Sequence, residues 1–462
     1  MTSPTSAVQK PLANARLRIF LAAVAIRWVY DVALFAAMGR EGLMGADSHG
    51  YLAAAQTMVA QASAGTLGGW AWLGADPGVM PIYPLFLALN VALFGSLAPL
   101  TGAMLQGVLD GVTCLMIYRL AQLIEPRFAT AAAIAAAVNP SQIVVAGLLY
   151  NDSIFVLFAA LALTAATAWL RQPSWRAAAG LGLGLGLAAL DRIVIAPWAP
   201  VVVVLLLLAQ AVRGRWRLLH VRQMAATAAI FCLLIAPVIG RNMSQYGAFA
   251  LTPQGGAHLA LWIVPLVQEA KDGTPWERSA EAMQDLRRAR FGAQGSNPFA
   301  NSKQFETIGR ERLAQLGLTP LVKAWVTGMT INLGAPAIII SPPVAQLPRT
   351  GFFATRGKTP SEKIVNFLFH SDNARYAWIL LIGIAGVGLI RLIQLAGAYA
   401  VLRDKANWPI AVMLVLWCGF ILAASGPVAS PKYRLPLEPV LCLLTGGGVE
   451  MLRRLRGRQA AA

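Results

Sequence analysis

Long apolar segments recur along the chain, and short polar turns rich in Arg and Lys separate them. A helix that crosses a bilayer needs about 20 mostly apolar residues, and within lipid only helices and closed barrels satisfy the backbone. We therefore expect an all-α polytopic membrane protein, a bundle of about 10 to 12 transmembrane helices. The apolar segments are 17–38, 81–97, 101–123, 129–149, 153–170, 177–190, 193–211, 223–239, 378–402, 408–424 and 436–452.

Clusters of basic residues predict which ends of these segments face the cytoplasm. Loops rich in Lys and Arg stay on the cytoplasmic side, and such clusters occupy 171–176, 213–222, 403–405 and 453–458. Both termini are then cytoplasmic, and the first segment is a retained signal anchor. Three acidic residues face the outside, as do the stretches 240–375 and 426–435; these acids are Asp47, Asp152 and Asp191.

This topology requires one early apolar segment not to cross the membrane. Three apolar segments separate Asp47 from Asp152, and three full crossings would place the two acids on opposite faces. Segment 81–97 is short and contains Pro81 and Pro84, whereas Asn139-Pro140 interrupts segment 129–149. Either one is a candidate for a partial or re-entrant element. We favour ten full crossings.

The stretches between the crossings define one membrane domain, residues 1–462, with two notable outer loops. Residues 39–80 form the first outer loop, and 240–375 form a large one. Within the large loop, the apolar stretch 321–347 contains three prolines, so we expect it to lie on the membrane surface or to re-enter. The run Gly180-Leu-Gly-Leu-Gly-Leu-Gly186 lies inside an apolar segment and predicts a closely packed helix surface, not a phosphate loop.

Composition excludes a soluble domain. Hydrophobic residues make up 57% of the chain, charged residues 13%, and the mean hydropathy is +0.60. The net charge of +18 lies in short clusters between apolar segments, which argues for topology signals and against a nucleic-acid partner. All four cysteines fall in apolar segments without metal-ligand spacing, so we expect no disulfide framework and no zinc site.

Acidic residues are scarce, 20 in 462, and three of them lie at predicted outer membrane boundaries: Asp47, Asp152 and Asp191. A carboxylate at such a place is costly to desolvate and marks a functional candidate. If these acids converge, one can deprotonate an acceptor while another orients it or holds a divalent cation. The alternative is that each caps a helix, or that Asp191 only pairs with the adjacent Arg192.

A second candidate group, Lys432-Tyr433-Arg434, precedes the last apolar segment on the same predicted face. Arg provides a planar fork and Lys a point charge, so such a cluster suits a phosphate near lipid headgroups. The alternative is interfacial anchoring. Further along the large loop, His258 is a metal ligand, an acceptor contact or an interfacial residue. The loop tryptophans, Trp70, Trp72, Trp262 and Trp276, either stack on sugars or form the interfacial belt.

Arg27, Asp31 and Asp110 are charged residues in the middle of apolar segments. Arg27 and Asp31 stand four residues apart on one helical face and predict a structural ion pair. Asp110 has no local partner, so we expect a buried hydrogen bond to another helix or, alternatively, a place on a proton or ion path.

Taken in order, these motifs resemble the GT-C superfamily of integral-membrane glycosyltransferases. They resemble in particular the bacterial branch similar to dolichyl-phosphate-mannose protein mannosyltransferases and lipid A aminoarabinose transferases. The matched pieces are Asp47-Ser-x-x-Tyr51, Pro-x-Tyr-Pro-Leu-Phe-Leu-Ala at 81–88, Asn-Pro-Ser at 139–141, Asp152 at a helix start, Leu-Ala-Ala-Leu-Asp-Arg192, Pro237-Val-Ile-Gly-Arg241-Asn242 with Tyr246-Gly247, and Tyr433-Arg434-Leu-Pro436.

The resemblance implies transfer of a sugar from a polyprenyl-phosphate carrier to an acceptor on the non-cytoplasmic face of a bacterial inner membrane. By matched position, Asp47 is the base of an inverting single displacement and Asp152 the supporting acid. Lys432 and Arg434, with Arg192, neutralise the carrier phosphate as it leaves. The remaining expected substrate contacts are Tyr51, His258 and Tyr433.

The position after Asp47 is Ser, where the protein mannosyltransferases have a second acid. We therefore expect a lipid, lipopolysaccharide or polysaccharide acceptor rather than a protein. Some relatives bind a divalent cation; this chain has no obvious ligand cluster, and the metal stays unassigned.

Two other classes compete with this interpretation. A secondary transporter or lipid flippase would use Arg27, Asp31 and Asp110 along a path near the midplane. A polyprenyl-linked O-antigen ligase or polymerase would place its key arginines in the large loop, where the candidates are Arg288, Arg290 and Arg310.

Overall fold

The computed structural model describes residues 5–347, 355–357, 359–370 and 374–459, and within them every regular element is a helix. Part of the predicted loop 240–375 lies outside these residues. The first half contains α1 (Thr5–Met38), α2 (Ser48–Ser63), α3 (Ile82–Phe94), α4 (Ala98–Ile124), α5 (Ala129–Ala137), α6 (Pro140–Ala146), α7 (Asp152–Arg171), α8 (Trp175–Asp191), α9 (Trp198–Val212) and α10 (Leu218–Tyr246).

The second half begins with short helices and ends with long ones. It contains α11 (Gln254–His258), the π-helical turn η6 (Leu259–Ile263), α12 (Val264–Asp272), α13 (Trp276–Phe291), α14 (Pro298–Leu316), α15 (Leu318–Gly334), α16 (Pro342–Ala345), α17 (Pro360–Phe369), α18 (Ala374–Leu402), α19 (Trp408–Ser425), the 3₁₀ segment η10 (Pro431–Leu437) and α20 (Glu438–Gln459).

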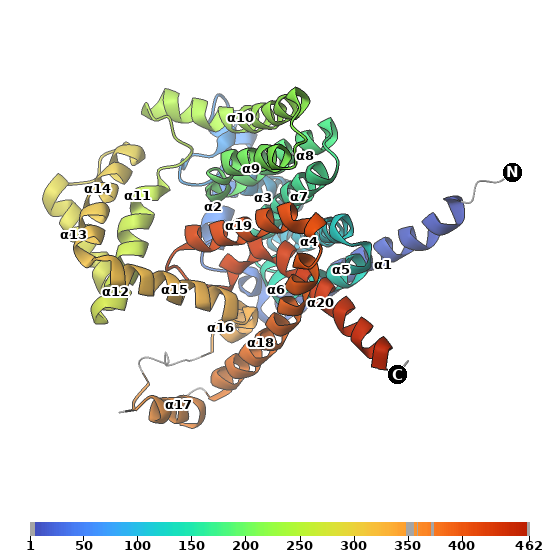
Figure 1. Ribbon diagram of the computed structural model, residues 1–462. Coiled ribbons are helices and arrows are strands. Elements are labelled where there is room, and N and C mark those ends of the chain that lie inside the picture. The colour runs from blue at the N-terminus through green and yellow to red at the C-terminus, as the bar shows by residue number, and fades with distance from the viewer. Residues whose placement is uncertain (1–4, 348–354, 358, 371–373, 460–462) are drawn as a thin grey trace.

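The long helices form the bundle, and α11–α14 form a separate group at one side of it (Figure 1). Both ends of the chain emerge on the opposite side in this view. Eight stretches of the described chain are long and apolar enough to cross a membrane, or nine if a bent helix pair is one span. The predicted multi-pass helical bundle is confirmed. The number of crossings stays approximate, because the stretch Ile82–Ile124 comprises both α3 and α4.

The bent pair falls in segment 129–149, one of the two candidates for a partial or re-entrant element. Helices α5 and α6 meet at Asn139-Pro140 with a bend of 46°. Pro140 has no N–H to donate to the Ala136 carbonyl, and the Ser141 N–H turns to the Asn139 side chain at 2.8 Å, which leaves the Ala137 carbonyl without its helical donor. The Asn139 N–H donates to the Ala136 carbonyl at 3.2 Å, so the Ala137 carbonyl is the acceptor at the bend that needs a donor from elsewhere.

Arg27 of α1 supplies this donor. Its guanidinium donates to the carbonyls of Ala136 at 3.2 Å and Ala137 at 2.7 Å, and its Nε donates to Asp110 of α4 at 2.5 Å. The predicted ion pair between Arg27 and Asp31 is wrong, because Arg27 pairs with Asp110. The oxygens of Asp31 are buried and have no hydrogen-bond partner among the described residues.

Glycines allow close packing between helices, as the Gly180–Gly186 run predicts. A Cβ on Gly184 of α8 would lie 2.7 Å from the Ala162 nitrogen of α7, and one on Gly182 would lie 2.8 Å from the Thr227 carbonyl oxygen of α10. Helix α18 meets α20 in the same way, because a Cβ on Gly397 would lie 1.8 Å from the Leu444 carbonyl oxygen. Only glycine permits backbones to approach this closely.

Candidate functional site

Two acidic and two basic side chains converge where several helices begin or end. Asp47 directly precedes α2, Asp152 begins α7, Arg192 follows α8, and Lys432 lies in η10 before α20. The Lys432 Nζ lies 2.8 Å from Asp47 Oδ2. The side chain of Asp47 is 51% exposed, whereas that of Lys432 is only 17% exposed. The pair therefore presents an accessible carboxylate against a largely buried cation.

Asp47 does not act as a helix cap. It occupies the N-cap position of α2, yet its side chain makes no capping hydrogen bond. The adjacent Ser48 holds the turn instead, because its buried hydroxyl accepts a hydrogen bond from the Gly45 N–H at 2.8 Å. This division leaves the Asp47 carboxylate free to face Lys432.

Tyr150 contacts Lys432 and the backbone next to Asp47, although no motif in the sequence predicts a role for it. Its hydroxyl accepts a hydrogen bond from the Ala46 N–H at 2.8 Å, next to Asp47, and its ring centroid lies 4.7 Å from the Lys432 Nζ. Burial raises the pKa of Tyr150, so the phenol stays protonated at neutral pH. The glycine at position 45 is the one trace of this contact in the sequence, because a Cβ there would lie 2.1 Å from the Tyr150 hydroxyl.

The second acid, Asp152, forms an ion pair with Arg192. Asp152 is 2% exposed and begins α7, and its carboxylate faces Arg192. The expected local pair between Asp191 and Arg192 is therefore not formed as an ion pair, and both Asp191 oxygens are buried without a hydrogen-bond partner among the described residues. Burial raises the pKa of Asp191, and the nearby charge of Asp152 adds to this.

Tyr433 connects the two ion pairs. Its ring centroid lies 5.5 Å from the Lys432 Nζ and 5.9 Å from the Arg192 Cζ, within the usual range of cation–π contacts. We call Asp47, Tyr150, Asp152, Arg192, Lys432 and Tyr433 the Asp47 cluster. Tyr51 lies nearby in α2, where its ring packs edge-on against Tyr83 at 4.9 Å. Burial raises the pKa of Tyr51, an effect that the positive charge of Arg192 opposes.

Arg434 adjoins the Asp47 cluster in sequence but is directed into the protein. Its Nε donates to Glu438 at 3.0 Å, and one Nη donates to the Ser141 hydroxyl at 2.7 Å. The other Nη donates to the carbonyls that end α15, those of Asn332, Leu333 and Ala335. Arg434 is 3% exposed, so the cations within the cluster are Lys432 and Arg192.

His258 ends α11, which packs against α14 in the separate helical group. Burial lowers the pKa of His258, which favours the neutral imidazole. No hydrogen bond or ion pair joins it to the Asp47 cluster in the part of the chain that the structure describes. In the same group, Trp262 and Trp276 pack with ring centroids 4.7 Å apart.

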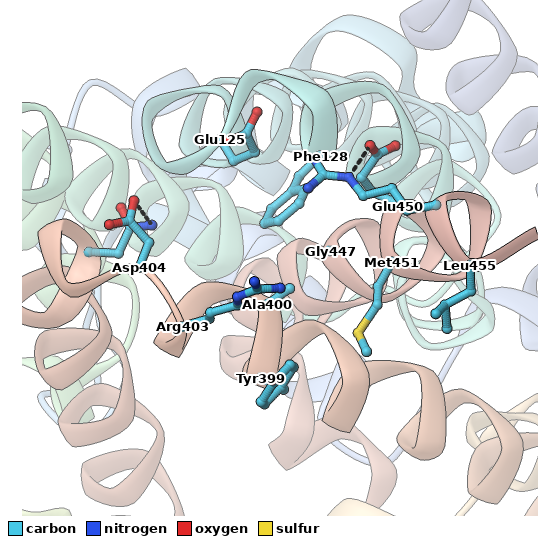
Figure 2. Close-up of a pocket in the computed structure, with 12 residues that line it drawn as sticks. Glu125, Phe128, Tyr399, Ala400, Arg403, Asp404, Gly447, Glu450, Met451 and Leu455 are labelled. Carbon is cyan, nitrogen blue, oxygen red and sulfur yellow. Dashed lines mark hydrogen bonds and ion pairs between the residues drawn. The ribbon is translucent and has the colours of Figure 1, made fainter. Parts of the chain in front are cut away.

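A cavity of about 460 Å³ lies near the other end of α20 and does not include the cluster. Figure 2 shows its lining, where the end of α18 and the last turns of α20 meet Phe128. Glu125, Asp404 and Glu450 line it together with Arg403 and Arg454. Because η10 precedes α20, the length of that helix separates this cavity from Lys432. Among the described residues, no group of three or more His, Cys, Asp or Glu is arranged to hold a metal ion.

The family model described as dolichyl-phosphate-mannose-protein mannosyltransferase matches residues 76–240. That range contains Tyr150, Asp152 and Arg192, but neither Asp47 nor Lys432. A comparison with curated proteins finds no match.

Solved structures resemble the chain over most of its length. The apo oligosaccharyltransferase of Archaeoglobus fulgidus gives a TM-score of 0.54 at 14% identity, covering 96% of this chain and 51% of that one. The same archaeal enzyme, AglB, in complex with an inhibitory peptide and a dolichol-phosphate gives 0.54 at 14% identity, covering 97% and 52%. ArnT from Cupriavidus metallidurans, bound to undecaprenyl phosphate, gives 0.41 at 15% identity, covering 94% and 77%.

The chain spans about half the length of the archaeal enzyme, and the likeness shows that the two share a fold over that half. The family-model match and this shared fold both support the resemblance to the GT-C superfamily of integral-membrane glycosyltransferases that the sequence motifs predict.

Proposed function

We propose that this protein transfers a sugar from a polyprenyl-phosphate carrier to a lipid, lipopolysaccharide or polysaccharide acceptor on the non-cytoplasmic face of a bacterial inner membrane. The observation that carries the proposal is the Asp47 cluster. It joins an exposed carboxylate to buried cations at the ends of spanning helices, where both a lipid phosphate and a polar acceptor have access.

The chemistry needs one base and one anion site. The acceptor oxygen attacks the anomeric carbon of the sugar from the side opposite the phosphate, and the bond from that carbon to the phosphate oxygen breaks. The acceptor proton passes to the Asp47 carboxylate, and the bonding electron pair leaves with polyprenyl phosphate. Because cations stabilise this leaving group, it needs no proton. The configuration at the anomeric carbon inverts.

Each charged residue of the cluster has a role in this scheme. Lys432, now paired with Asp47, turns to the donor phosphate and so releases a carboxylate oxygen for the acceptor. Arg192 contributes the second positive charge, held in place by its ion pair with Asp152. The guanidinium of Arg434 has a different role, because its hydrogen bonds join the start of α20 to α15 and α6. These bonds hold η10 in place and thereby position Lys432. Tyr51 and Tyr433 are proposed to contact the substrate.

The competing functions have less support. Arg27 and Asp110, which a transporter would place along a path, are hydrogen-bonded to each other and to the broken helix. The arginines that a ligase would use pair with acids on the surfaces of α13 and α14: Arg290 with Glu311 at 2.5 Å, and Arg288 with Asp285 at 3.8 Å.

The decisive experiment measures turnover of purified full-length protein with polyprenyl-phosphate sugars and candidate acceptors. Loss of a general base lowers turnover by about 10²- to 10⁴-fold, and we expect this of Asp47→Asn. The matched control is Glu41→Gln, an exposed carboxylate in the same loop that lies 3.4 Å from Arg40 and should have no effect. Equal turnover in wild type and Asp47→Asn would refute the assignment of the base.

A further inference from the structure

A narrow apolar groove of about 340 Å³ opens between α9 and α19, away from the Asp47 cluster. Leu208, Ala209 and Val212 line it from α9, and Val412 lines it from α19. Several of these side chains are more than half exposed, Val212 by 86% and Val412 by 54%. Apolar surface of this kind on a membrane-spanning helix faces lipid.

The mouth of this groove lies at the membrane boundary. Both α9 and α19 belong to candidate spans, and Arg213 directly follows the last residue of α9, while Trp408 begins α19. Tryptophan is typical of the headgroup level. From Arg213 back to Leu205 the helix rises by about 12 Å, so the groove extends from the boundary well into the hydrocarbon layer.

Positive charge gathers at this mouth. Arg213 lines the groove, and its pKa is lowered by burial and by the neighbouring charges of Arg215 and Arg171. The Arg171 guanidinium is held by the Leu123 carbonyl at 2.7 Å and by Asn407. The Arg215 side chain has no hydrogen-bond or ion-pair partner among the described residues, and it is exposed. An anion here would relieve the repulsion between these cations.

We propose that this groove binds an anionic phospholipid, with an acyl chain between α9 and α19 and the phosphate against Arg213 and Arg215. A ligand with both an apolar chain and a negative headgroup matches both parts of the site. The larger cavity on the other side of the α18–α19 turn is a poorer site for an anion, because three acids, Glu125, Asp404 and Glu450, contribute to its lining (Figure 2).

The test is a lipid titration of delipidated full-length protein in detergent, followed by native mass spectrometry. The probes are phosphatidylglycerol and phosphatidylcholine with identical acyl chains. An arginine near an anionic headgroup contributes about fivefold in affinity, so wild type should bind the first phosphatidylglycerol at least fivefold more tightly than phosphatidylcholine. Arg213→Gln and Arg215→Gln should each lower the affinity for phosphatidylglycerol about fivefold and leave the affinity for phosphatidylcholine unchanged.

A second variant tests the apolar part. Ala209→Phe fills the groove and should weaken binding of both lipids, while all three arginines remain. Arg403→Gln, in the cavity across the turn, is the matched control and should bind as wild type does. If Arg213→Gln fails to fold, Arg215→Gln decides the headgroup question. The proposal is overturned if wild type shows no preference for phosphatidylglycerol, if Ala209→Phe binds it normally, or if millimolar inorganic phosphate displaces it.

Discussion

At the residue scale, the Asp47 cluster is held together by side chains that make more than one contact. Lys432 meets the Asp47 carboxylate and two aromatic faces, and Tyr150 meets Lys432 and the Ala46 N–H. Spacing along the chain does predict local pairs, but here it misleads: Arg27 and Arg192 both bypass a nearby acid for one on another helix. A buried charge pairs with the best-placed partner that desolvation leaves, wherever it lies in the sequence.

Tyr150→Phe tests the support of the proposed base. The change removes the acceptor of the Ala46 N–H and should cost about 1 kcal/mol of stability, while misplacement of Asp47 lowers turnover by roughly 10² at most. Unfolding and turnover are measured on the same preparation. Tyr399→Phe, in the cavity at the other end of α20, should leave both quantities unchanged. Normal turnover in Tyr150→Phe would contradict a positioning role.

At the element scale, breaks in helices are repaired by arginines from other helices. Arg27 binds the carbonyls at the α5–α6 break, and Arg434 binds those that end α15 before Pro336. In lipid such carbonyls have no water to bind, so the donors must come from the protein. The break itself is predictable from Asn139-Pro140, whereas the residue that repairs it is not, because it comes from 110 positions away.

Arg27→Met should destabilise the bundle by about 3–5 kcal/mol, because it leaves Asp110 as a buried charge without its ion-pair partner and leaves the Ala137 carbonyl without a donor. Thermal unfolding in detergent measures this loss. Arg18→Met is the matched control, since Arg18 lies on the same helix and is exposed. If the two variants unfold at the same temperature, Arg27 does not repair the break.

Gly397→Ala tests the close contact of α18 with α20. The added Cβ meets backbone, the Leu444 carbonyl oxygen at 1.8 Å, so the helices must separate at a cost of about 1–3 kcal/mol or more. Gly388 lies on the same helix with nothing within 4 Å of an added Cβ, and Gly388→Ala should be neutral or slightly stabilising. Equal thermal stability of the two variants would argue against the packing of α18 on α20.

At the scale of the whole molecule, the Asp47 cluster lies near one end of α20. The apolar groove between α9 and α19 lies near the α18–α19 turn, and that turn adjoins the cavity at the other end of α20. Our topology places these two ends on opposite faces of the membrane. The bent α5–α6 pair is the natural candidate for the segment that fails to cross, as the parity of acids and basic clusters requires.

Cysteine labelling tests this topology in intact cells. In a background without the four native cysteines, His49→Cys lies beside Asp47 at a side chain that is 59% exposed, and it should react with an impermeant thiol reagent added outside. Lys405→Cys, in the exposed α18–α19 turn, should react only after the membrane is opened. Labelling of both residues from the same side would overturn the assignment.

The sequence by itself determined the helical membrane class, two candidate weak segments that include the one at Asn139-Pro140, and the candidates Asp47, Asp152, Arg192 and Lys432, because hydropathy, proline and rare charges act locally. Only the tertiary structure decided which charges meet. Asp47 and Lys432 stand 385 positions apart, and Arg434, adjacent to Lys432, is directed away from them. Such pairings follow from how helices pack and where burial forces a charge to find a partner, which no local pattern encodes.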